Sequence, residues 1–125
     1  MESQNVAIAG LGRVGERFLE RMLDYQEKGR VNLVSCAELN DTDGCEMARS
    51  RGIPLESLAD LAGRGDDVDI IFDLTGSNTA RQELREAMVE QENHHTVIAP
   101  ENVARMMWSL IGTEDLPEVH GNGGY

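Results

Sequence analysis

The sequence is poor in the residues that several protein classes depend on. Its 125 residues include two cysteines, Cys36 and Cys45, and a single lysine, Lys28. Cys36 lies in an apolar segment and Cys45 in a polar one, so we expect no structural disulfide and predict reduced thiols in a cytoplasmic protein. A chain of this length forms one domain and can bury about two thirds of its unfolded surface, so it needs no disulfide to fold.

Long hydrophobic runs are also missing. No segment approaches the roughly 20 apolar residues of a membrane-spanning helix, and residues 1–5 lack the positive charge and apolar stretch of a signal peptide. The formal net charge of −12, from 23 acidic and 11 basic side chains, repels nucleic acid and anionic lipid. We therefore expect neither as a partner. A dinucleotide is still compatible with this charge, because backbone amides and a helix N-terminus can hold its phosphates.

The first part of the chain has the pattern of a βαβ unit. Residues 5–10 form an apolar run that ends in glycine, typical of a buried parallel strand. Residues 13–28 have apolar side chains at intervals of four, four and three, which predicts an amphipathic helix. Residues 31–37 form a second apolar strand. Together these segments predict strand, helix and parallel strand.

The rest of the chain repeats the alternation. The predicted elements are a short helix over 43–51, a brief third strand or extended link over 52–55, a helix over 55–63, a strand over 68–74, a helix over 79–91 capped by Ser77 or Asn78, a strand over 96–99, and a helix that ends near 111 with Pro100 in its first turn. This order predicts an α/β fold, a doubly wound parallel sheet of the Rossmann type with about five strands in the order 3-2-1-4-5. We predict a domain over 1–111 and a Gly-rich, acidic tail over 112–125 that is loosely ordered or docked on a partner.

The strongest motif lies between the first strand and the first helix and reads Gly10-Leu11-Gly12-Arg13-Val14-Gly15. A strand before it, a helix within it and an acidic residue after the second strand match the context of a dinucleotide-binding fingerprint. Gly10 permits the tight turn, Gly12 lets a pyrophosphate approach the backbone, and Gly15 lets the helix lie close to the sheet. The alternative is a glycine turn that only packs a helix on a sheet.

Glu38 predicts which dinucleotide is bound. It follows Gly15 by 23 residues, close to the expected interval of about 20. A carboxylate there accepts hydrogen bonds from the ribose hydroxyls and repels the 2′-phosphate of NADP. Leu39 and the next two residues include no Arg or Lys to receive that phosphate. NAD is therefore predicted in preference to NADP. Arg13 could cover the pyrophosphate, or could simply be a solvated residue at the start of the helix.

A second candidate segment, Leu74-Thr75-Gly76-Ser77, ends the fourth predicted strand. In the predicted strand order it lies at the topological switch point, beside the glycine turn. Gly76 would allow close approach of the nicotinamide ribose, which Thr75 or Ser77 could hydrogen-bond. The alternative is an ordinary turn from strand to helix. With this segment the predicted cofactor-binding residues are Gly10, Leu11, Gly12, Arg13, Val14, Gly15, Glu38, Leu39, Leu74, Thr75, Gly76 and Ser77.

Residues 6–15, 34–38, 52–61 and 68–78 resemble the N-terminal NAD(P)-binding domain of homoserine dehydrogenases, dihydrodipicolinate reductases and glucose-fructose oxidoreductase-like dehydrogenases. The resemblance covers roughly residues 5–111 and implies the fold and the cofactor contacts given above. We expect the chain to lack the catalytic domain that those enzymes carry.

No catalytic or metal site is predicted from the residues. The oxidoreductase-like group has Glu-Lys-Pro after the fifth strand, whose lysine donates a proton, whereas this chain has Ile98-Ala99-Pro100-Glu101. His94 and His95 precede the fifth strand, so we expect them at the edge of the sheet away from the cofactor. His120 lies in the tail.

Two functions are compatible with these features. The first is an NAD(H)-binding module that acts as a redox sensor or regulatory subunit. The second is a small oxidoreductase whose substrate site a second subunit completes. The last helix, residues 101–111, has apolar side chains around more than one face, which predicts a homodimer contact there. Cover by the chain's own tail is the alternative.

Overall fold

The computed structural model describes residues 3–111, so the predicted tail over 112–125 lies outside the described residues. The fold is built on one sheet of five parallel strands in the order β3-β2-β1-β4-β5. The strands are β1 (Gln4–Ala9), β2 (Val31–Ala37), β3 (Leu55–Glu56), β4 (Ile70–Asp73) and β5 (Val97–Pro100). The predicted doubly wound order is confirmed.

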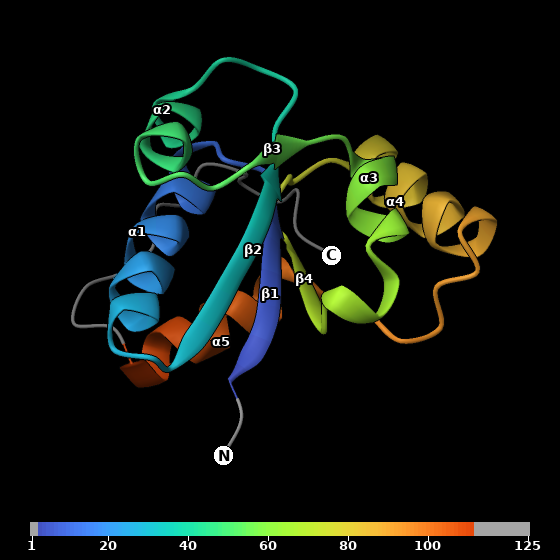
Figure 1. Cartoon of the computed structure of the whole chain (residues 1–125). Helices are drawn as coiled ribbons and strands as arrows, with labels where there is room; N and C mark the ends of the chain where they lie inside the picture. The colour runs from blue at the N-terminus through green and yellow to red at the C-terminus, as the bar shows by residue number, and fades with distance from the viewer. Residues whose placement is uncertain (1–2, 112–125) are drawn as a thin grey trace.

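Helices cover both faces of this sheet (Figure 1). They are α1 (Arg13–Glu27), α2 (Asp43–Ser50), α3 (Leu58–Gly63), α4 (Asn78–Glu90) and α5 (Glu101–Ile111), with a short 3-10 turn η1 (Gly65–Asp67). Helices α1, α2 and α5 lie on one face, and α3 and α4 lie on the other. Among residues 3–111, no helix is long and apolar enough to cross a membrane.

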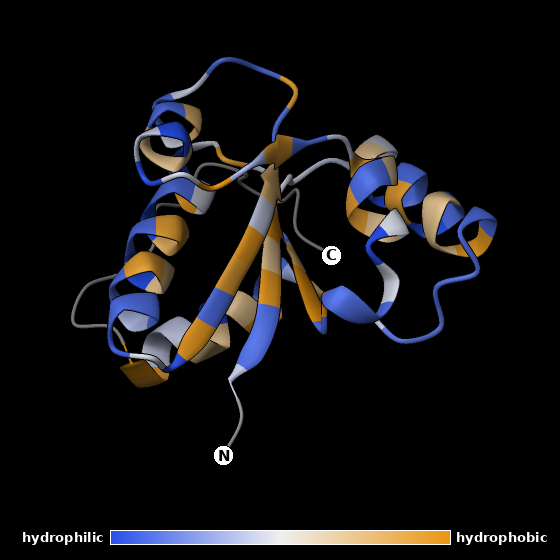
Figure 2. Ribbon diagram, in the orientation of Figure 1, coloured by the Kyte–Doolittle hydropathy of each residue, from blue (hydrophilic) through white to orange (hydrophobic). Residues whose placement is uncertain are grey.

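Two apolar layers hold the helices on the sheet, and Figure 2 shows hydrophobic residues along the strands and on the flanking helices. In the larger layer, Phe18 of α1 packs against Phe72 of β4 with ring centroids 4.8 Å apart, and against Trp108 of α5 at 6.5 Å. In the smaller layer, Leu61 of α3 and Leu84 of α4 pack on the opposite face of the strands. Successive strand side chains point to opposite faces, so a strand buried on both faces has a continuous apolar run.

The third strand differs from its prediction. It was expected over 52–55 or as an extended link, but β3 is Leu55–Glu56. Gly52 has a positive φ of 74° and belongs to the turn after α2, and the N–H of Ile53 still donates to the Ala48 carbonyl of that helix. The chain becomes extended only afterwards, and α3 begins late because Ser57 caps it.

The prediction for Pro100 was wrong. It ends β5, opposite Asp73 of β4, and α5 begins at the next residue. Proline has no N–H to give to a ladder, which is tolerated at the edge of a sheet. Because β5 is an edge strand, Pro100 fits there as well as it would in the first turn of a helix.

Candidate functional site

The glycine turn connects the carboxyl end of β1 to α1. Gly10 has φ of 99°, and a Cβ on it would lie 2.7 Å from the backbone of Leu74 and Thr75. A Cβ on Gly15 would lie 1.9 Å from the Gly10 carbonyl oxygen. Only glycine fits these two positions, because the turn, the end of β4 and the start of α1 are packed against each other.

The middle glycine differs from the other two. A Cβ on Gly12 would meet no atom within 4 Å. Gly12 is the N-cap of α1 and no side chain caps this helix, whereas Thr42, Ser57 and Ser77 cap α2, α3 and α4. The first N–H groups of a helix have no partner within the helix and carry partial positive charge. The open space and the uncapped N-terminus fit a phosphate group.

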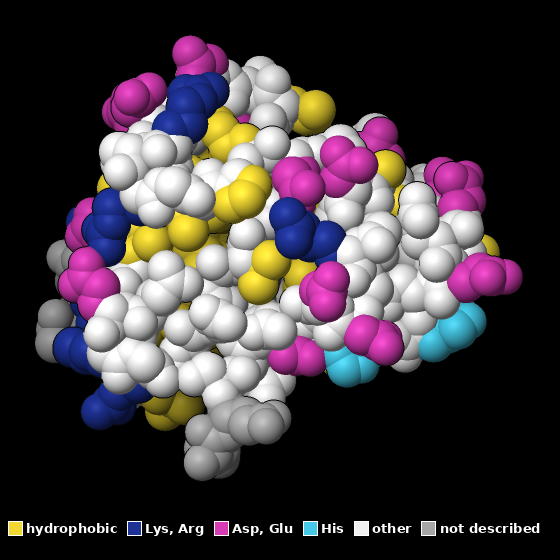
Figure 3. Space-filling model, in the orientation of Figure 1, with side chains coloured by type: hydrophobic (Ala, Val, Ile, Leu, Met, Phe, Trp, Pro, Cys, Tyr) yellow, Lys and Arg dark blue, Asp and Glu magenta, His cyan; other side chains and the backbone are white. Residues whose placement is uncertain are grey.

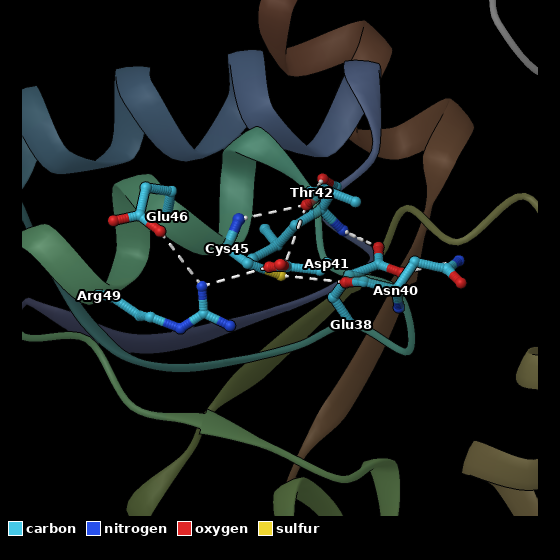
Figure 4. A network of polar contacts seen from close by, with 8 residues as sticks. Glu38, Asn40, Asp41, Thr42, Cys45, Glu46 and Arg49 are labelled. Atoms are coloured by element: carbon cyan, nitrogen blue, oxygen red, sulfur yellow. Dashed lines mark hydrogen bonds and ion pairs between the residues drawn. The ribbon is translucent and has the colours of Figure 1, made fainter.

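The Glu38 carboxylate is bound to this turn (Figure 4). Its Oε1 accepts a hydrogen bond of 2.7 Å from the N–H of Leu11, and its Oε2 accepts one of 3.0 Å from the N–H of Asn40. The side chain therefore joins the ends of β1 and β2. Carboxylate oxygens can accept further hydrogen bonds, so Glu38 can hold the turn and receive ribose hydroxyls as well.

A second bond links the same turn to α2. The Thr42 hydroxyl donates to the Leu11 carbonyl at 2.7 Å and accepts from the N–H of Cys45 at 3.2 Å. The Arg49 guanidinium reaches back from the end of α2 to Asp41 at 3.3 Å and Glu46 at 3.4 Å (Figure 4). Arg49 of α2 thus places a cation beside the loop after β2, although no Arg or Lys follows Glu38 closely in the sequence.

A cleft of about 580 Å³ lies at the carboxyl edge of the sheet. It is lined by Gly10, residues 37–40 at the end of β2 and after it, residues 56–59, Thr75 and Ser77 after β4, and five residues of α4, namely Ala80, Glu83, Glu86, Ala87 and Glu90. Its ionisable lining groups are all glutamates. The Arg64 guanidinium, 2.6 Å from Glu56, lowers the pKa of that carboxyl.

The structure brings the predicted site residues together at one edge. Gly10, Glu38, Leu39, Thr75 and Ser77 line the cleft, and Leu39 is 90% exposed. Of the remaining predicted residues, Gly12 and Arg13 are exposed at the start of α1, Gly76 is half-buried, and Leu11, Val14, Gly15 and Leu74 are buried. Leu11, Val14 and Leu74 belong to the larger apolar layer, so any contact they make with a ligand is through backbone.

His94 and His95 lie at the other edge, before β5. The His95 imidazole is 2.7 Å from Asp69, which also accepts a hydrogen bond from the N–H of Asn5 at 2.8 Å. The Asn5 hydrogen bond, and then His95, lower the pKa of Asp69. The histidines thus lie away from the glycine turn, as predicted. His120 lies outside the described residues.

Several polar groups at this edge of the sheet were not predicted from the sequence. Thr42 and Arg49 belong to a helix that was only weakly predicted, although a Thr followed by acidic residues in the first turn is typical of a helix N-terminus. The glutamates of α4 recur at intervals of three and four, which places them on one side of the helix. Asp73, a carboxylate inside an apolar strand, was the clearest signal overlooked, since buried Asp is rare without a partner.

Comparisons with known proteins agree with this geometry. Residues 10–107 match the family described as homoserine dehydrogenase, NAD-binding domain. No curated protein matches the chain. Among solved structures, RSP in complex with β-NADH has a TM-score of 0.55 at 14% identity, with 87% of this chain and 60% of that chain covered.

Two further solved structures cover this chain in part. Myo-inositol 2-dehydrogenase from Lactobacillus plantarum has 19% identity and a TM-score of 0.49, with 78% of this chain and 36% of that chain covered. GenD2 from gentamicin A biosynthesis, in complex with NAD, has 19% identity and a TM-score of 0.49, with 79% and 34% covered. This chain therefore spans about a third of the length of those two proteins.

The family match extends from the glycine turn to the last helix and so includes every element that forms the carboxyl edge. It agrees with the sequence prediction of NAD as the cofactor. The chain belongs to the family of homoserine dehydrogenase NAD-binding domains, whose cofactor is NAD.

Proposed function

We propose that this chain binds NAD(H) across the carboxyl edge of its sheet. The pyrophosphate lies at the N-terminus of α1, the adenosine ribose lies at Glu38, and the nicotinamide ribose lies at Thr75–Ser77. The observation that carries the proposal is the open space at Gly12 beside the uncapped helix N-terminus. A helix N-terminus of this kind is suited to an anion.

The Glu38 carboxylate supports selectivity for NAD over NADP. It lies in the cleft, held by Leu11 and Asn40, and the other ionisable lining groups are glutamates too. A 2′-phosphate placed there would face several negative charges. The Arg49 guanidinium does not offset them, because Asp41 and Glu46 already engage it.

Binding is tested by calorimetric titration of the purified chain with NAD, NADH and NADPH. We expect NADH and NAD to bind more tightly than NADPH. Gly12→Ala should weaken NADH binding at least about tenfold, because the new Cβ occupies the space proposed for the pyrophosphate. Gly63→Ala is the matched control, since Gly63 is exposed on α3 outside the cleft lining. Failure of all three dinucleotides to bind would contradict the proposal.

Glu38→Ala addresses specificity. The variant should bind NAD less tightly and reduce the difference between NAD and NADP affinities. An unchanged ratio would mean that Glu38 serves only to hold the glycine turn.

For the biological role we favour a cofactor-binding module that acts as a redox sensor or regulatory subunit. The Glu38 carboxylate and the hydroxyls of Thr75 and Ser77 line the cleft and can hydrogen-bond the ribose hydroxyls of a dinucleotide. The alternative is a small oxidoreductase whose substrate site a second subunit completes, and the dehydrogenase family of the chain favours it. Screening NADH oxidation with small carbonyl compounds separates the two. NADH oxidation that is abolished by a substitution in the cleft would establish that the chain is an oxidoreductase.

We also propose that two copies associate through α5. Its outer stripe is exposed, with fractions of 37% for Val103, 59% for Met106 and 77% for Leu110, and apolar surface of this kind is common where proteins associate. Sedimentation should show a dimer at tens of micromolar, and Met106→Glu with Leu110→Glu should give a monomer. A wild-type monomer would refute this contact.

The free cysteines Cys36 and Cys45 support a reducing compartment such as the cytoplasm.

A further inference from the structure

The end of β4 contains a buried carboxylate. Asp73 is the last residue of that strand and is 1% exposed. Its Oδ1 accepts two hydrogen bonds from Thr75, one of 3.1 Å from the backbone N–H and one of 2.8 Å from the hydroxyl. The carboxylate therefore fixes both the backbone and the side chain of a residue that lines the cleft.

The hydrogen bonds continue from Thr75 along the turn. Thr75 Oγ1 accepts from the N–H of Ser77 at 3.2 Å, and Ser77 Oγ accepts from the N–H of Ala80 at 3.1 Å. Gly76, with φ of 63°, lies between them. One series of hydrogen bonds thus begins at Asp73 and runs through Thr75 and Ser77 to Ala80 in the first turn of α4.

The series is also coupled to the glycine turn. A Cβ on Gly10 would lie 2.7 Å from the N of Thr75 and the carbonyl of Leu74, so the two turns touch. A shift of Thr75 would therefore alter the space in which a dinucleotide crosses from one turn to the other.

A carboxylate is a costly way to hold this turn. Within residues 3–111, Oδ2 of Asp73 is buried and has no hydrogen-bond partner. Burying a polar oxygen without a partner is unfavourable, and unfavourable local arrangements often mark functional sites. The turn that Asp73 holds lies on the far side of β1 from Glu38, because β4 and β2 flank β1.

We propose that Asp73 is a positioning residue for the nicotinamide half of NAD(H). It acts through Thr75 and Ser77, which it holds at the edge of the cleft. The adenosine half of the dinucleotide is bound at Glu38. In a doubly wound sheet the two halves of a dinucleotide lie on opposite sides of the first strand. This inference rests on the proposed NAD(H) site.

The test compares NADH, followed by its fluorescence, with ADP, which has only the adenosine half and its phosphates. Asp73→Ala should weaken NADH binding about tenfold, as expected for lost positioning hydrogen bonds, and reduce the fluorescence of bound NADH. ADP affinity should stay within about twofold. Asp73→Asn keeps an oxygen acceptor for Thr75 and should restore NADH binding.

Asp69→Ala is the matched control. Asp69 also accepts a backbone hydrogen bond, from Asn5, but it lies at the opposite edge of the sheet. It should leave the affinities for both ligands unchanged. Equal losses of NADH affinity and ADP affinity in Asp73→Ala would overturn the positioning role. So would a failure of Asp73→Asn to restore NADH binding.

If Asp73→Ala does not fold, Thr75→Val carries the same test. Valine keeps the shape of threonine but removes the hydroxyl that joins Asp73 to Ser77, so it should also weaken NADH selectively. Weaker binding of both NADH and ADP, or unchanged binding of both, would overturn the inference. A wild-type chain that binds neither NADH nor ADP would instead refute the proposed site itself.

Discussion

At the residue scale, the glycines of the turn differ in whether a Cβ atom can be added without a clash. Gly10→Ala should be strongly destabilising, because an L-residue with positive φ costs about 1–2 kcal/mol and the new Cβ would also meet backbone at 2.7 Å. Overpacking adds about 1–3 kcal/mol. Urea denaturation measures the sum. Gly29→Ala is the control, since Gly29 has φ of 71° but no atom within 4 Å of its Cβ position. Equal losses in the two variants would contradict the close packing at Gly10.

A second residue-scale prediction concerns alkaline pH. Burial raises the pKa of the Cys36 thiol from 9.0 to about 12. The folded state therefore holds this proton more tightly than the unfolded state. The contribution to stability is complete below pH 9 and is lost as the pH rises from 9 to 12, by about 1.4 kcal/mol for each unit. Urea denaturation should show little of this loss between pH 7 and 8 and approach this slope between pH 10 and 11, and Cys36→Ala should have a smaller slope there. Identical slopes would contradict the prediction.

At the element scale, α2 depends on its cap more than a short helix usually does. Thr42 caps α2 and also donates to the Leu11 carbonyl of the glycine turn. Loss of an N-cap costs about 0.5–2 kcal/mol. Thr42→Ala should therefore cost more than Ser57→Ala, which removes only the hydrogen bond from the N–H of Asp60 at the start of α3. Thermal unfolding compares the two, and Thr42→Ser should be close to wild type. A larger loss in Ser57→Ala would show that the bond to Leu11 adds nothing.

Helix and strand boundaries show why elements are only partly predictable. The apolar period of α1 and the alternation of helices and strands depend on neighbours in the chain, so they were predicted nearly to the residue. The third strand and Pro100 were not, because a two-residue strand and an edge proline have no local pattern of their own. Their conformation depends on β2 and β4, their partners in the sheet.

At the scale of the whole molecule, charge is unevenly distributed. Residues 56–95 carry ten acidic and three basic side chains, and Figure 3 shows acidic groups gathered over α3 and α4, with most basic groups over α1 and α2. Repulsion among like charges destabilises the compact state, and the exposed ion pairs contribute little in return.

Salt should therefore stabilise this protein. Raising NaCl shortens the screening length, so the urea midpoint at pH 7 should increase. The control is the same series near pH 4.5, the isoelectric point of the sequence, where the salt effect should nearly vanish. A midpoint that falls with salt at pH 7 would mean that attractive ion pairs outweigh repulsion.

The sequence by itself determined the fold class, the strand order and the glycine turn, and it predicted NAD as the cofactor, because each follows from apolar period, residue size or charge at fixed spacing. Only the tertiary structure decided how the edge is held together. The bond from Glu38 to the N–H of Leu11 joins residues 27 apart, and that from Thr42 to the Leu11 carbonyl joins residues 31 apart. The burial of Asp73 depends on helices packed over both faces of the sheet. Such contacts arise when strands align side by side, and no pattern within one segment specifies them.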